Sequence, residues 1–148
     1  ELDVTAIELA RARNRAPEAL TLARAALAAY PLSRAVGITY AQTLLSAGRT
    51  DDAIPYLKDK TREDTAQPIW WDMLARAYAD KGRRVEQHRA LAEKYARDGA
   101  WGSAVEQLKL ARDAGDADFY TLSEVDARLH QMERQYREEK AEDKALPK

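Results

Sequence analysis

The sequence predicts an all-α protein made of long helices joined by short turns, and three observations support this. First, it contains 29 Ala and 16 Leu but only 4 Ile, 5 Val and 8 Thr. This balance favours helices, because β-branched residues are the ones enriched in strands. Second, only six Gly and five Pro interrupt 148 residues. Third, helix-stop residues recur at a fixed spacing. Together they exclude a β-sandwich, a disulfide scaffold and a disordered chain.

Turn residues mark the limits of the first four helices. Asn14 suits the end of the first helix, and Pro17 suits the first turn of the second. Pro31 ends the second helix and Gly48 ends the third. Pro55 removes one backbone hydrogen bond from the fourth, so we expect a distorted first turn there. These helices are expected at residues 2–13, 17–29, 33–47 and 51–64.

The second half is divided in the same way. Pro68 opens the fifth helix, Gly82 ends it, and Gly99 ends the sixth. The chain is dense in charge from Glu133 onward. We therefore expect one domain over residues 1–140 and a disordered charged tail over residues 141–148. The last four helices are expected at residues 68–81, 85–98, 101–113 and 117–140.

The helix-stop residues follow a repeat of 34 residues. Asn14, Gly48 and Gly82 are each 34 positions apart, and Gly99 follows after a half-step of 17. Between them, aromatic, Leu and small residues recur on one helical face, as in Trp71, Leu74, Ala75 and Tyr78. This pattern resembles the tetratricopeptide repeat. The resemblance implies an all-α tetratricopeptide-repeat (TPR) solenoid of about four antiparallel helix pairs, or about eight helices.

Composition narrows the classes of function. The net charge is −1, with no basic arm in either half, so we expect no nucleic-acid partner. No apolar run reaches the roughly 20 residues of a membrane span, so we expect no membrane insertion. His88 and His130 are the only histidines, and neither is part of an HExxH motif. With no cysteine either, we expect no cofactor and no metal in this chain, and no catalytic residues.

The adjacent tryptophans Trp70 and Trp71 are a candidate anchor for a partner. Neighbouring residues on a helix point about 100° apart, so the two cannot face the same surface. Trp71 fits the internal position of the repeat, which leaves Trp70 facing outward. The simpler interpretation, and the favoured one, is that Trp70 packs on the loop before Pro68.

The first helix of each tetratricopeptide pair lines a concave face that can hold a peptide or a partner helix. For any single charged residue on that face, a role as solvated surface is the simpler interpretation. As a group, the outward residues are the best hypothesis for a partner-binding groove. They are Ile38, Gln42, Ile69, Trp70, Asp72, Met73, Arg76, Arg89 and Glu93.

Residues 71–129 carry a more specific resemblance. The blocks concerned are Trp71–Tyr78, Gly82–Glu93, Ala104–Lys109, Asp118–Tyr120 and Asp126–Leu129. They are similar to the C-terminal repeat domain of bacterial periplasmic zinc metalloproteases of the beta-barrel assembly-enhancing type. The first seventy residues share only the register of the repeat.

This resemblance implies a non-catalytic interaction module of a periplasmic protease that acts in outer-membrane protein assembly and quality control. Zinc is then expected only on a catalytic domain outside this chain. The implied partners are the protein's own protease domain and components or substrates of the assembly machinery. Because the sequence opens at Glu1, we expect a processed chain or an excised fragment. The alternatives are a free-standing cytoplasmic adaptor or scaffold unrelated to proteolysis, and, less favoured, an enzyme.

Overall fold

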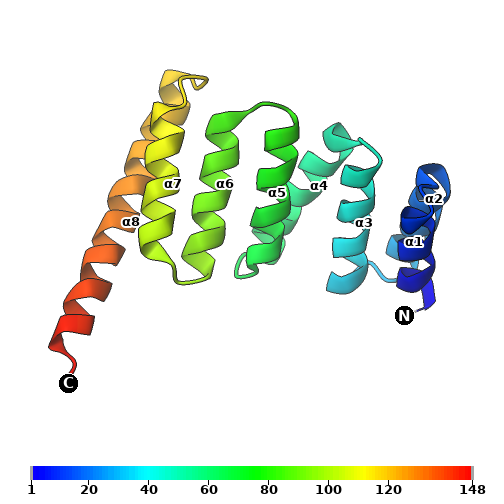
Figure 1. The fold of residues 1–148 in the computed structure, drawn as a ribbon, viewed down its shortest axis with the longest axis horizontal. Helices are drawn as coiled ribbons and strands as arrows, with labels where there is room; N and C mark the ends of the chain where they lie inside the picture. Colours follow the sequence, from blue (N-terminus) through cyan, green and yellow to red (C-terminus); the bar gives the residue numbers. More distant parts are fainter. Residues whose placement is uncertain (1, 148) are drawn as a thin grey trace. The chain divides into compact units, whose positions relative to one another are not determined.

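A computed structural model describes residues 2–147, which form eight α-helices (Figure 1). Their bounds lie within two residues of the predicted ones, except at the end of the last helix. The all-α prediction is thus confirmed for the described residues. The helices are α1 (Leu2–Ala12), α2 (Ala16–Ala29), α3 (Arg34–Ser46), α4 (Thr50–Glu63), α5 (Pro68–Asp80), α6 (Arg84–Arg97), α7 (Trp101–Asp113) and α8 (Phe119–Ala145).

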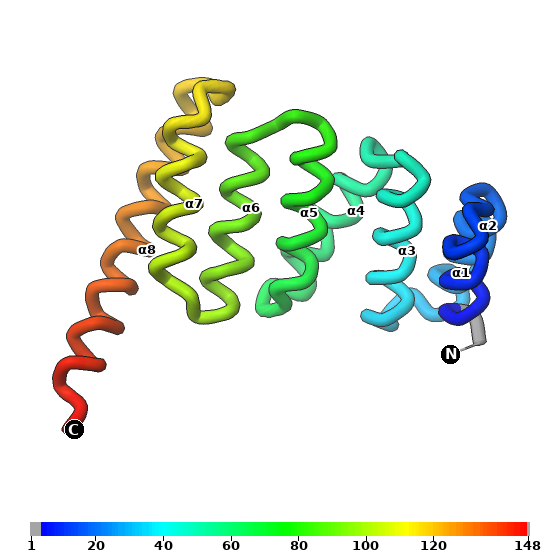
Figure 2. The backbone as a smooth tube through the Cα atoms, in the orientation of Figure 1, coloured from blue at the N-terminus to red at the C-terminus, as the bar shows by residue number. Residues whose placement is uncertain are grey.

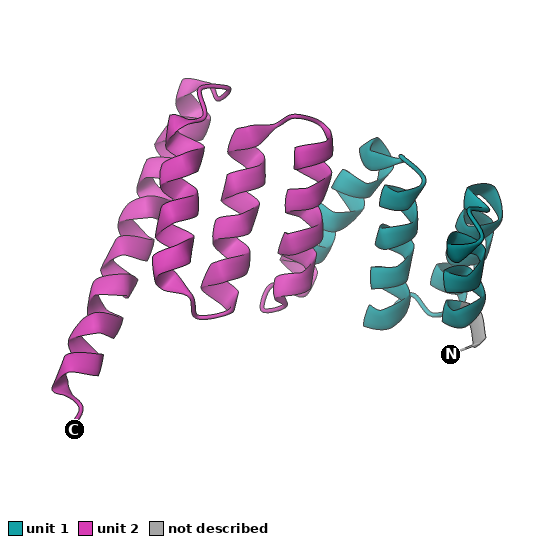
Figure 3. Cartoon of the chain, in the orientation of Figure 1, with its two compact units in different colours: residues 1–60 teal, residues 61–148 magenta. Residues whose placement is uncertain are grey.

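The chain divides into two compact units (Figure 3), whereas the sequence predicts one domain over residues 1–140. Unit 1 comprises Glu1–Lys60 and unit 2 comprises Thr61–Lys148. The boundary falls inside α4, whose last residues belong to unit 2.

The helix-stop residues all build the same turn. Gly82 has a φ of +68°, and the N–H of Arg83 just after it donates to the carbonyl of Tyr78 at 2.9 Å. Asn14 has a φ of +58° and is the one described non-glycine residue in this conformation. A left-handed residue followed by this backbone bond closes the carbonyl end of a helix. The predicted role of these stop residues is therefore confirmed.

In unit 1, α1, α2 and α3 pack on one another through small and aliphatic side chains. Alanines on α2 let the helices approach closely, because a methyl group leaves room for the neighbouring backbone. Ile7 of α1 fills the space beside them and is fully buried. This core consists of Ile7, Ala23, Ala26 and Val36.

In unit 2, α5, α6 and α7 are antiparallel neighbours, and α8 packs on α7 (Figure 2). A Cβ placed on Gly102 of α7 would lie 3.2 Å from the ring of Tyr136 on α8, so these two helices are in close contact there. The shared core of α6, α7 and α8 comprises Val85, Ala92, Ala96, Ala104, Val105, Leu108, Ala111, Val125, Leu129 and Met132.

The loop between α7 and α8 is bonded to the start of α6. Both carboxylate oxygens of Asp116 accept backbone N–H groups there, from Arg84 at 2.8 Å and from Val85 at 3.2 Å. The guanidinium of Arg84 donates in return to the carbonyl of Ala114 at 2.6 Å. Asp116 thus caps a helix from 32 residues away in the sequence, a role usually filled by the residue next to the helix.

The last helix is longer than predicted. It continues to Ala145, through most of the segment expected to be a charged tail. α8 has 27 residues against 13 in α7, so its C-terminal turns extend beyond the end of its partner (Figure 1). Its side chains after Lys140 are exposed up to residue 147. Favourable helix propensity of the Glu, Lys and Ala residues there explains why the helix continues.

Candidate functional site

The predicted groove residues fall in both units. Ile38 and Gln42 belong to unit 1, and the other seven belong to unit 2. On α5, Asp72 and Arg76 are exposed and Ile69 is half-buried. Among the described residues neither Asp72 nor Arg76 forms an ion pair. These two charges are thus available to a partner.

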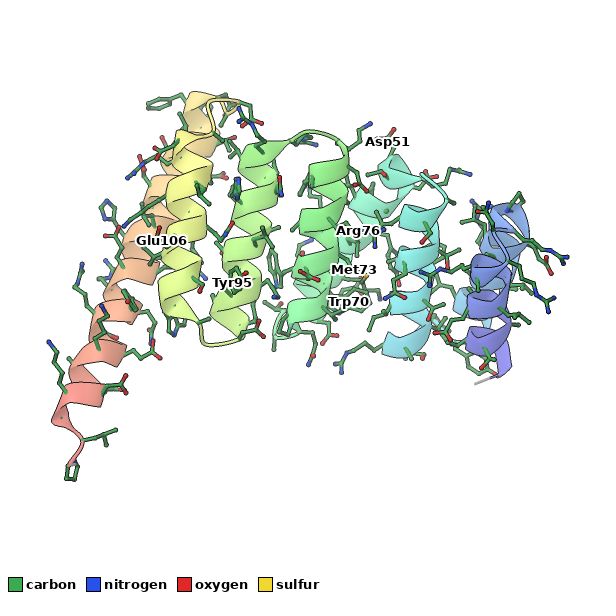
Figure 4. The ribbon with its side chains drawn as sticks, viewed as in Figure 1. Asp51, Trp70, Met73, Arg76, Tyr95 and Glu106 are labelled. Atoms are coloured by element: carbon green, nitrogen blue, oxygen red, sulfur yellow. The ribbon has the colours of Figure 1, made fainter. Side chains whose placement is uncertain are left out.

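Trp70 and Met73, labelled with Arg76 along α5 in Figure 4, do not offer exposed anchors. Met73 is 5% exposed and Trp70 only 1%. The indole N–H of Trp70 donates to the carboxylate of Asp64 at 2.9 Å, in the turn before Pro68. Trp70 therefore packs on the preceding loop, as the favoured interpretation of the sequence predicts, and its inclusion among the outward residues of the groove is wrong.

Trp71 takes the outward position that the repeat pattern predicts for Trp70. It is half-exposed, and its indole N–H donates to the carbonyl of Thr65 at 3.3 Å. The guanidinium of Arg97 lies 4.6 Å from the ring centre, which is the geometry of a cation–π contact. The repeat pattern predicts that Trp71 is internal and Trp70 external, because it depends on helical spacing alone. It does not include the hydrogen bond between Trp70 and Asp64 in the preceding turn.

The two charged groove residues predicted on α6 are engaged by unit 2 itself. Glu93 accepts from Arg97 on its own helix and from Arg128 of α8, the latter at 2.7 and 3.0 Å. Arg89 forms a 2.8 Å ion pair with Glu124. The hydrogen bond that Arg128 donates to Glu93 raises the pKa of the Arg128 guanidinium above its ordinary value. Both side chains therefore join α6 to α8, and using them for a partner would require breaking these pairs.

Unit 1 contains a cavity of about 420 Å³ beside the predicted residue Gln42. Arg11 of α1 lines it and donates to the amide oxygen of Gln42 and to the hydroxyl of Ser46, both at 3.3 Å. The Nε of Arg11 is buried and has no hydrogen-bond partner among the described residues. The cavity is lined by Glu8, Arg11, Ala12, Asn14, Ala16, Ala19, Thr43, Ser46 and Ala47.

Arg11 is a feature that the sequence analysis missed. It lies four residues after the buried Ile7, so helical spacing places it at the edge of the core face. That spacing was the available signal, but a single arginine in a helix does not by itself indicate a pocket. The pocket exists because Thr43 and Ser46 of α3 and Ala47 just after it, more than 30 residues away in the sequence, also line it.

The titratable side chains form no catalytic arrangement in the described residues. His88 lies 2.9 Å from the amide oxygen of Gln107, as a packing histidine would, and His130 is exposed. Burial raises the pKa of Tyr78, with Arg83 opposing the shift. No group of three or more His, Cys, Asp or Glu residues within the described chain could hold a metal ion.

Comparison with known protein families identifies the repeat. Residues 10–77 match the tetratricopeptide repeat family. The chain contains a tetratricopeptide repeat domain. The match runs from the end of α1 through most of α5. No significant match to a curated protein sequence was found.

A tetratricopeptide repeat domain is in general a protein–protein interaction module without catalytic activity of its own. The helix pairs, their small-residue packing and the left-handed turns all agree with this family. None of the helices in the described part of the chain has the length and apolar character that crossing a membrane requires.

Proposed function

We propose that this tetratricopeptide domain is the interaction module of a periplasmic metalloprotease of the beta-barrel assembly-enhancing type. In this role it recruits substrates or components of the outer-membrane protein assembly machinery. The observation that carries the proposal is the set of sequence blocks between residues 71 and 129, which extends over α5, α6, α7 and the first part of α8. The proposal places zinc and proteolysis on a separate catalytic domain, with the chain in the periplasm.

Two surfaces support a role in protein binding. On α5, Asp72 and Arg76 are exposed charges of opposite sign. Such charges determine which partner binds and how it is aligned along the helix more than they determine how tightly it binds. In unit 1, the cavity beside Arg11 is large enough for a side chain of a partner. It offers a guanidinium that donates, within the described part of the chain, to two neutral oxygens. An extended peptide could use either surface.

The full-length gene product tests the context of the proposal. A secretory signal and an upstream HExxH motif support it. A native start close to Glu1 contradicts it and supports the alternative, a free-standing tetratricopeptide adaptor unrelated to proteolysis.

A binding experiment tests the function itself. The chain is mixed with the purified protease domain of the same protein and, separately, with purified outer-membrane assembly components. We expect binding that weakens in the double variant Asp72→Arg/Arg76→Glu and in Arg11→Gln. Glu106→Lys serves as the matched control, because Glu106 is an exposed charge on α7 (Figure 4). The absence of binding to either probe by the unmodified domain contradicts the proposal.

A further inference from the structure

Two aromatic side chains stand almost fully in solvent at the start of α8. Phe119 is 79% exposed and Tyr120 is 81% exposed. Their rings contact each other edge to face, with centroids 6.3 Å apart. Exposed large aromatic groups of this kind are typical of interface anchors, where Tyr and Phe are enriched. We call residues 112–126, which carry this pair, the α7–α8 tip.

The backbone of the α7–α8 tip is held on both sides of the aromatic pair. The carboxylate of Asp118 accepts the N–H of Thr121 at 2.8 Å and so caps α8. This hydrogen bond lowers the pKa of Asp118 below its ordinary value. On the other side, Asp116 and Arg84 bind the loop to the start of α6. A side chain displayed on an ordered backbone loses less entropy on binding than one on a mobile loop.

The α7–α8 tip is also strongly acidic. It contains one basic residue, Arg112, and five acidic residues, so its formal charge is −4 in a chain whose total is −1. Arg84 and Arg89 of α6 bind Ala114 and Glu124 of the tip and reduce this to −2. The acidic residues are Asp113, Asp116, Asp118, Glu124 and Asp126. Glu124 and Asp113 are paired with arginines, whereas Asp116, Asp118 and Asp126 keep an excess of negative charge next to the aromatic pair in the sequence. An apolar pair with such an excess is complementary to an apolar pocket with a basic border. It is not complementary to an anionic lipid surface, which would repel it.

We propose that the α7–α8 tip is a second interaction surface, which inserts Phe119 and Tyr120 into an apolar pocket of a partner protein bordered by Lys and Arg. The aromatic pair supplies the buried apolar area, and the acidic residues around it select the basic border and speed association. This surface uses none of the residues assigned to partner binding on α5 or in the unit 1 cavity. The proposal can therefore hold or fail independently of the proposed function.

A photo-crosslinking experiment identifies the partner. The photoreactive residue p-benzoylphenylalanine replaces Phe119 in the cell that naturally makes the protein, and the same residue replaces Leu32 in a control. Leu32 is 98% exposed but belongs to unit 1. We expect a protein crosslinked from position 119 and not from position 32, attached at an apolar pocket with Lys or Arg on its border. Crosslinks to lipid, to a second copy of this chain, or to nothing overturn the proposal.

The affinity of the purified crosslinked protein for this chain then tests the mechanism. We expect Phe119→Ala/Tyr120→Ala to weaken binding at least about 30-fold, as for interface hot spots. Asp113→Asn/Asp126→Asn is expected to weaken it less and to flatten its dependence on salt. Leu32→Ala and Asp72→Arg/Arg76→Glu are the controls and should change the affinity less than about twofold. An affinity that is insensitive to the aromatic pair, or lost only in the α5 variant, contradicts the proposal.

Discussion

The polar side chains that link helices differ between the two compact units. In unit 1, α1 is joined to α3 by two 3.3 Å hydrogen bonds from Arg11 to neutral oxygens. The ion pairs Arg15–Glu18 and Arg49–Asp52 join residues three positions apart, at exposed sites. Unit 2 also has pairs between near neighbours, such as Arg83–Glu86, but in addition charged pairs join segments more than 30 residues apart, as between Glu93 and Arg128.

This difference predicts how strongly the substitution of a polar side chain lowers the stability of each unit. Exposed pairs between near neighbours contribute little, and the bonds from the Arg11 guanidinium to neutral oxygens are long and partly open to solvent, so they contribute only modestly. A carboxylate shared by two guanidinium groups and partly withdrawn from water is costly to remove, because the positive charges then lose their partner. We therefore expect unit 2 to depend strongly on single polar side chains and unit 1 to depend mainly on its packed core.

The tryptophans allow the two units to be followed separately. All three, Trp70, Trp71 and Trp101, lie in unit 2. Tryptophan fluorescence therefore reports on unit 2, whereas far-ultraviolet circular dichroism reports on the helices of both units. The predictions below use this contrast.

The largest effect is expected from Glu93→Ala. The side chains of Glu93 and Arg97 are 17% and 18% exposed, and Arg128 binds the same carboxylate. Removing it leaves two guanidinium groups without a carboxylate partner, although Arg97 keeps its bond to Thr65 and Arg128 its bond to Gln131. We expect this to lower the free energy of unfolding by about 2–3 kcal/mol. Urea denaturation followed by tryptophan fluorescence measures this. The control is Glu106→Ala at an exposed site on α7, expected to stay within about 0.5 kcal/mol. Equal effects of the two would contradict the prediction.

An intermediate effect is expected from Asp116→Ala. The substitution removes the acceptor for two backbone N–H groups at the start of α6 and frees the loop before α8. We expect a loss of about 1–2 kcal/mol in the free energy of unfolding, as for other helix caps. Asp113→Ala, in the same loop region but pairing only with its neighbour Arg112, is the control. If Asp113→Ala is equally destabilising, the loss of a negative charge, and not the loss of the helix cap, is the cause.

A smaller effect is expected in unit 1 from Gln42→Ala. The amide of Gln42 accepts one 3.3 Å hydrogen bond from Arg11. Its removal should lower the free energy of unfolding by less than about 1 kcal/mol, measured by circular dichroism in urea. Tryptophan fluorescence of the folded protein should not change. If Gln42→Ala lowers the free energy of unfolding as much as Glu93→Ala does, unit 1 depends on single polar side chains as strongly as unit 2, which contradicts the prediction.

The smallest effect is expected in the pH dependence of the Asp118 cap. The folded-state pKa of this carboxyl lies below its ordinary value of 3.8, so its stabilisation is fully present above that pH. It is lost as the pH falls through the lower folded-state pKa. The stability difference between the unmodified protein and Asp118→Asn should thus be constant from pH 5 to 7 and shrink below about pH 4. A difference that grows on acidification would contradict this sign.

Much of the fold could be predicted because the decisive signals are local. Asn14, Gly48 and Gly82 mark turns whose geometry depends on the backbone of a single residue. The alanine-rich faces follow from helical spacing, and Ala41, Ala75 and Ala92 are buried as the repeat pattern indicates. The end of α8 differs from the prediction, because the helix propensity of its last residues outweighs the repulsion expected from their charge density.

The candidate site was predictable only in part, because side-chain partners are not a local property. The pattern places Asp72 and Arg76 on the surface correctly, yet it exchanges the environments of Trp70 and Trp71. It also gives no sign that Glu93 is bound by Arg128 from another helix.

The sequence alone thus determined the helices, their turns and the 34-residue repeat, since each depends on residues within a few turns of one another. Tertiary structure decided which polar groups are free and which are bound. It engages Arg89 and Glu93 in ion pairs, sets Arg11 beside a cavity and leaves Phe119 and Tyr120 in solvent. The physical reason is that electrostatic pairing and burial depend on distances between side chains far apart in the sequence, which only the packed helices fix.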